Sequence, residues 1–216
     1  MSLTYGATNG AEEEPVVTHA SSAMRMMHVV CFQYESDANR FRLQLSERMR
    51  QFGLTLHPDK TALIRFGRFA IRDEKARSGK KPGVFQFLGF THFCKIKRNG
   101  RFIVGRKTNR KKLRKQIKLV TRALRKRMHE PPKVTLKWLR SVIQGHFNYF
   151  AVPGNSRQLN QFSYEVICRW YKNLCRRSQR KKLTWAKFLS AIKGKLPSVS
   201  ILHPYPHERF RAKYSK

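Results

Sequence analysis

The sequence has few acidic residues for its length. Only 12 of its 216 residues are Asp or Glu, against 47 Lys and Arg, so the formal net charge is +35. Nine of the twelve acids precede Lys75, and none occurs between Lys75 and His129. A basic surface without interleaved acids needs a polyanion to neutralise it, and nucleic acid is the polyanion most consistent with such a stretch.

Long apolar runs are also lacking, and no secretory leader is expected. No apolar run approaches the ~20 residues of a helix that spans a bilayer, so no membrane partner is expected. The N-terminus is acidic and has no apolar core. The cysteines are few and scattered, which favours a reducing, cytoplasmic setting; they are Cys31, Cys94, Cys168 and Cys175. Cys168 and Cys175 lie seven residues apart on one predicted helix, but no further ligands accompany them, so no metal site is expected.

The basic stretch itself has helical periodicity. Its apolar residues recur at the spacing of one helix face, at Leu113, Ile117, Val120, Leu124 and Met128. Thr108 or Asn109 can cap the start of this helix, and Pro131-Pro132 stops it. The candidate nucleic-acid-binding cations on its other faces and just before it are Lys107, Arg110, Lys111, Arg114, Lys115, Lys118, Arg122, Arg125 and Lys126. A solvated basic face is the alternative, although like charges without acidic partners repel one another by a few tenths of a kcal/mol per pair.

Further helices are predicted downstream. One follows Pro132, a second begins near Ser156, and a last one runs from Thr184 to Gly194. Their short connections favour a small packed bundle, with Trp138, Leu139 and Trp170 in its core. Three tyrosines could stack on nucleobases or could instead pack in the core, namely Tyr149, Tyr164 and Tyr171. Tyr149 is the one we take as a candidate binding residue.

The N-terminal half predicts a small α+β layer. Residues 1–23 are small and polar, and we expect them to be disordered or unrelated to the rest. Strands are predicted over 28–34 and 61–66, with a helix between them that Ser36-Asp37 caps and Gly53 ends. Residues 72–83 read as a charged loop. Residues 85–96 and 101–104 then flank Arg98-Asn99-Gly100, a strong hairpin signal.

Several ordered motifs resemble one family. They are Gly-Leu-Thr-Leu-His-Pro-Asp-Lys-Thr at 53–61, Phe-Leu-Gly-Phe at 87–90, Gly-His-Phe-Asn-Tyr-Phe-Ala-Val-Pro-Gly-Asn at 145–155 and Ile-Leu-His-Pro at 201–204. In order and spacing they resemble bacterial group II intron reverse transcriptase/maturases, over His28 to about Arg211. The family has a polymerase palm followed by a helical thumb that overlaps an RNA-binding maturase domain.

The resemblance implies a fold and its domains. Residues 24–106 would be a small palm remnant with a β-hairpin, and 107–195 an all-helical thumb/maturase bundle, before an extended tail at 196–216. The turn formed by Phe87, Leu88, Gly89 and Phe90 looks like the primer grip. The implied partner is structured RNA of a group II intron, or an RNA–DNA hybrid, for a cytoplasmic bacterial protein; the sequence leaves the oligomeric state open.

One departure from the family decides the expected chemistry. The family's polymerases use Mg²⁺ held by aspartates in a Tyr-Ala-Asp-Asp turn, and the alignment on Val29-Val30 places Met26 and Met27 there. Thioethers are soft ligands that do not hold Mg²⁺. We therefore assign no catalytic residue and expect no cofactor on this chain alone, as in an N-terminally truncated copy. The alternatives are an active RNA-directed DNA polymerase whose missing palm another chain supplies, and an unrelated basic RNA-binding protein.

Overall fold

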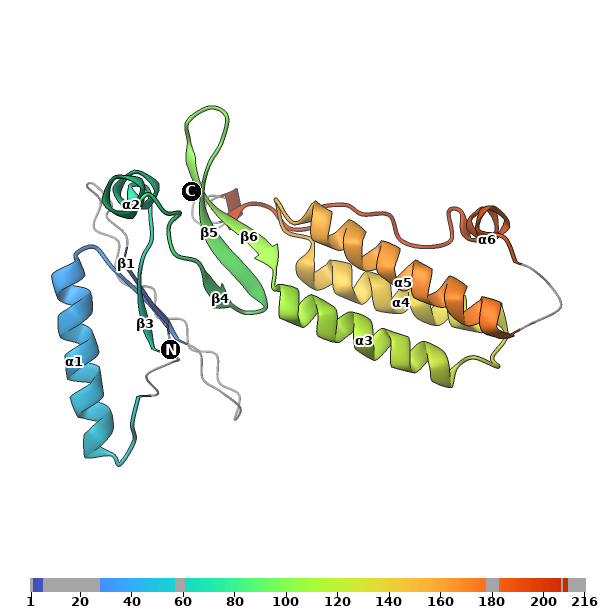
Figure 1. Ribbon diagram of the computed structural model, residues 1–216, viewed down its shortest axis with the longest axis horizontal. Helices are drawn as coiled ribbons and strands as arrows, with labels where there is room; N and C mark the ends of the chain where they lie inside the picture. The colour runs from blue at the N-terminus through green and yellow to red at the C-terminus, as the bar shows by residue number, and fades with distance from the viewer. Residues whose placement is uncertain (1, 6–27, 57–60, 178–182, 207, 210–216) are drawn as a thin grey trace. The chain divides into compact units, whose positions relative to one another are not determined.

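The chain is mixed α+β, as the sequence predicts. The computed structural model describes residues 2–5, 28–56, 61–177, 183–206, 208 and 209 (Figure 1). The chain divides into two units, residues 1–105 and 106–216, and each is described by itself. The division falls beside the position at which the sequence predicts the helical region to begin.

A parallel three-stranded sheet opens the first unit. Its strands are β1 (Ser2–Tyr5), β2 (Val29–Phe32) and β3 (Ala62–Arg65), in the order β2-β1-β3. Ser2 pairs with Val29 on one side and with Ala62 on the other, so β1 is the central strand. The expectation that residues 1–23 are disordered is therefore wrong for Ser2–Tyr5. Four residues are too few to show the alternation of apolar and polar residues that predicts a strand. This segment is a strand because it pairs with a neighbour along both of its edges.

The described part of the first unit also contains two helices. Helix α1 (Glu35–Gln51) connects β2 to β3, and its Phe41 ring lies 5.1 Å from that of Phe32. Its N-cap is Tyr34 rather than Ser36 or Asp37. Glu35 and Asp37 lie instead in the first turn, where the helix dipole stabilises negative charge. Helix α2 (Ala70–Ser78) replaces most of the predicted charged loop. It buries only Ala70, so its sequence has no apolar periodicity to reveal it.

A second, antiparallel sheet carries the predicted hairpin. Its strands are β4 (Phe85–Phe87), β5 (Phe90–Ile96) and β6 (Phe102–Thr108), in the order β4-β5-β6. The Asn99-Gly100 turn is confirmed: Gly100 has φ 75° and the Lys97 N–H donates to the Arg101 carbonyl at 2.9 Å. A second tight turn joins β4 to β5, and Leu88 and Gly89 both have positive φ there, as in the turns that suit hairpins.

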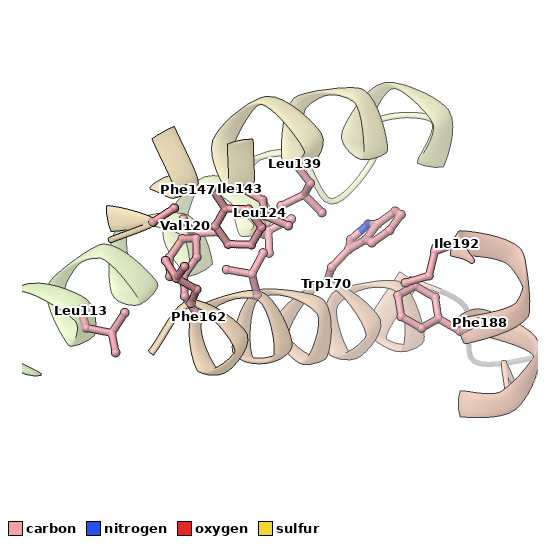
Figure 2. Packing of buried hydrophobic residues seen from close by; sticks show 13 residues of the cluster. Leu113, Val120, Leu124, Leu139, Ile143, Phe147, Phe162, Trp170, Phe188 and Ile192 are labelled. Carbon is pink, nitrogen blue, oxygen red and sulfur yellow. The ribbon is translucent and has the colours of Figure 1, made fainter. Parts of the chain in front are cut away.

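Packed helices make up most of the described part of the second unit. They are α3 (Arg110–Lys126), α4 (Pro132–Phe150), α5 (Ser156–Arg177) and α6 (Trp185–Ile192), close to the predicted ranges. Asn109 caps α3, since its side chain accepts hydrogen bonds from the N–H groups of Lys111 and Lys112. Figure 2 shows the core between the helices, to which all four contribute; its larger members include Leu124, Leu139, Ile143, Phe147, Phe162, Trp170 and Phe188. Trp138, expected in the core, is only half-buried and lies beneath the Arg127 guanidinium.

Buried polar contacts fix the start of α3 to the turn between α4 and α5. Asn155 is fully buried, and its side-chain oxygen accepts from the Thr108 N–H at 2.9 Å. Its amide nitrogen donates to the Thr108 hydroxyl and to the Phe150 carbonyl, both at 2.8 Å. Each such bond contributes about 1 kcal/mol net, and its loss would leave a buried group unpaired. The network therefore holds the basic helix in one register against α4 and α5.

The described part of the tail returns to the same turn. The N–H groups of Leu202 and His203 both donate to the Ala151 carbonyl, at 3.0 and 3.1 Å. His203 Nε2 lies 2.6 Å from the Asn148 carbonyl. Two of the sequence motifs, residues 145–155 and 201–204, are thus in contact within this unit.

Candidate nucleic-acid interface

Helix α3 separates its charges from its apolar residues. Leu113, Val120 and Leu124 are buried, whereas all eight candidate cations on the helix are exposed, as is Lys107 before it. Among the residues that the structure describes, no acid forms an ion pair with a cation of α3. Because Lys111 and Lys115, or Arg114 and Lys118, are four residues apart, their charges repel along the same face. A bound polyanion would relieve that repulsion.

The basic surface extends beyond the residues predicted from sequence. Lys112 is also exposed on α3, beside the candidate cations. A small hollow of about 70 Å³ between α3 and α5 is bordered by Arg125, Lys172 and Arg176, and by Arg169, which pairs with Glu165. The sequence did not indicate the α5 cations as binding residues, because α5 has the pattern of an ordinary amphipathic helix. Only the packing of α5 against α3 places them beside Arg125.

A groove runs between α3 and α4. Its volume is about 560 Å³, and Lys112, Lys115 and Leu119 line it from α3, with Gly145, His146 and Tyr149 from α4. Tyr149 is 53% exposed and its ring meets that of Phe150 edge-on, at 4.7 Å. Of the other tyrosines, Tyr164 is exposed, whereas Tyr171 packs against Trp185 and donates to the Leu183 carbonyl. The structure thus brings Tyr149 together with the cations of α3.

His146 forms part of the groove wall and is buried. Its ring stacks on that of Phe162 at 3.7 Å and lies 4.6 Å from that of Phe150. Burial among these rings lowers the pKa of His146 from 6.5 to about 4, because the imidazolium would lose its hydration. The His146 side chain is therefore uncharged at neutral pH.

The depressed pKa of His146 predicts a pH-dependent stability of the helical unit. His146 takes up a proton near pH 6.5 in the unfolded chain but only near pH 4 in the folded chain. Its contribution to the free energy of unfolding is therefore fully present above about pH 6.5 and is lost as the pH falls toward 4. Between pH 7.5 and 4 the free energy of unfolding should fall by about 1–3 kcal/mol more in the wild-type chain than in His146→Phe. Urea unfolding followed by tryptophan fluorescence measures this difference, and equal pH profiles of the two proteins would contradict it.

The primer-grip-like residues lie in the first unit. Phe87 and Phe90 are opposite one another at the end of the β4–β5 pair, and Leu88 and Gly89 form the turn. Phe90 is buried, whereas Leu88 is 52% exposed. These residues belong to a different unit from the cations of α3.

The described residues include no group of three or more His, Cys, Asp or Glu placed to hold a metal ion. Cys168 and Cys175 are free thiols. Residues 24–27, where the resemblance would place the aspartate turn, lie outside the described residues, as do 57–60 of the first motif. None of the helices in the described ranges is both long and apolar enough to cross a membrane.

Comparison with protein-family models, with curated proteins and with solved structures found no match for this chain.

Proposed function

We propose that the helical unit binds structured RNA through the exposed face of α3, as the RNA-binding part of a group II intron reverse transcriptase/maturase in the bacterial cytoplasm. The observation that carries the proposal is the row of exposed cations on α3 that have no acidic partner among the described residues. The buried Asn155 network supports it, because a helix held in one register presents its charges with little loss of freedom on binding.

The assignment to this family rests on the ordered motifs at 53–61, 87–90, 145–155 and 201–204. The positions aligned with the family's aspartate turn hold Met26 and Met27, so the proposed function is RNA binding without polymerisation by this chain alone. An RNA-directed DNA polymerase completed by a second chain is the alternative that the same motifs favour. A basic RNA-binding protein of another family would share the cations but not the motifs.

The dependence of affinity on salt tests the proposal. If about six phosphates of a duplex region are neutralised, the logarithm of the association constant should fall with the logarithm of salt concentration at a slope near −5. Fluorescence anisotropy with a labelled RNA stem-loop, from about 50 to 200 mM KCl, measures that slope. An affinity that does not change with salt would overturn the phosphate-contact proposal.

A further inference from the structure

The groove between α3 and α4 combines cations with an apolar surface that phosphate binding alone does not need. Lys112 and Lys115 lie on its α3 side, and none of the described residues that line it is acidic. Val142, Leu119 and the rings of Tyr149 and Phe150 provide apolar surface, and Leu119 is 47% exposed. At about 560 Å³ the groove falls within the size range of small-ligand sites. An exposed apolar surface beside cations that form no ion pair among the described residues suits an occupant with an apolar face and an anionic group.

We propose that this groove receives an unpaired nucleobase of the bound RNA, so that the helical unit prefers RNA with a bulged base over a fully paired stem. This inference rests on the proposed function, since it assigns one part of the RNA to one part of the same surface. A nucleotide supplies both required features, because its base stacks on an aromatic ring while its phosphate meets a cation.

Tyr149 is the residue placed to stack on the base. More than half of its surface is exposed, and the edge-on contact with Phe150 holds its ring at the side of the groove. Stacking of a base on an aromatic side chain contributes about 1–3 kcal/mol. Lys112 and Lys115 lie across the groove on α3, where they can neutralise the flanking phosphates.

Polar groups in the groove can meet the edge of a base. Gln116 and Ser141 line it, from α3 and α4 respectively, and both are exposed. These groups distinguish a base from a purely apolar occupant such as an acyl chain.

Gly145 makes the proposal testable without removing a charge. It lines the groove on the exposed side of α4, and a Cβ added there would meet no atom within 4 Å. The leucine side chain of Gly145→Leu should therefore occupy the groove, while the core and every cation stay intact. Gly145→Ala is the matched control, because it makes the same helix-favouring change and adds only one methyl group.

The experiment compares two RNA hairpins that differ by one unpaired adenosine in the stem. The wild-type chain and the Gly145→Ala variant should each bind the bulged hairpin about tenfold more tightly than the fully paired hairpin. This is the order of magnitude expected from one stacked base. Gly145→Leu and Tyr149→Leu should bind both hairpins with the affinity that the wild type has for the paired one. Circular dichroism of each variant at the assay temperature shows whether its helices are intact.

Four results would overturn the proposal. Equal affinity of the wild-type chain for the two hairpins would do so while leaving RNA binding in place, whereas failure to bind either hairpin would remove the proposed function itself. Discrimination that survives in Gly145→Leu would place the base elsewhere. Tighter binding of a glutamate–tyrosine copolymer than of the bulged hairpin, lost in Gly145→Leu, would assign the groove to an acidic peptide.

Discussion

Replacing Lys111, Arg114, Lys115 and Lys118 together with alanine is expected to weaken RNA binding by well over tenfold at physiological salt. All four are exposed on α3 and have no acidic partner among the described residues. Each phosphate contact that is lost returns condensed counterions to the RNA, so the salt slope should also become shallower by about 0.9 per contact. Fluorescence anisotropy over a range of KCl concentrations measures both quantities. A variant with wild-type affinity and slope would rule out α3 as the principal contact.

A matched variant separates a local effect from one of net charge. Replacing Arg40, Arg42, Arg48 and Arg50 with alanine also removes four positive charges, but from the exposed surface of α1, a helix of the other unit. Alanine favours helix in both cases, so neither set should lower the helix content. We expect the α1 variant to bind within a few-fold of the wild type. Equal losses in the two variants would show that the RNA responds to total charge and not to the α3 face.

Trp170→Ala is expected to lower the free energy of unfolding of the helical unit by about 3–5 kcal/mol. Trp170 is only 3% exposed and lies in the core between α5 and α6, with its ring edge-on to Phe188 at 5.2 Å (Figure 2). Truncation would remove this packing and leave a cavity where α6 covers the bundle. Since Trp138, Trp170 and Trp185 all lie in the second unit, tryptophan fluorescence during urea unfolding reports on that unit alone.

Trp170→Phe is the control for this substitution. The indole Nε1 of Trp170 is buried without a hydrogen-bond partner among the described residues, so phenylalanine removes an unpaired donor while it keeps an aromatic ring. Its loss of stability should therefore be clearly smaller than that of Trp170→Ala. Similar losses in both variants, or a loss below about 1 kcal/mol in Trp170→Ala, would contradict the position of Trp170 in the core.

Local signals were sufficient for most of the helical unit. The apolar spacing from Leu113 to Leu124, the Asn109 cap and the Pro131-Pro132 stop predict α3 because each acts within one or two turns of the chain. The Asn99-Gly100 hairpin was predictable for the same reason, since positive φ is a property of the turn residues themselves. Where no local periodicity exists, as in β1 and α2, the sequence predicted disorder or a loop and the structure differs.

The sequence by itself determined the charge of the molecule, the apolar and basic faces of α3 and the absence of acids from residues 75–129, because these depend only on residue type and helical period. The tertiary structure alone decided which residues meet across the bundle. Asn155 contacts Thr108 47 positions earlier, Tyr149 faces a groove edged by Lys112 and Lys115, and α5 places its cations beside Arg125. Such contacts depend on how whole helices pack, and packing is set by the combined shapes of side chains that are distant in sequence.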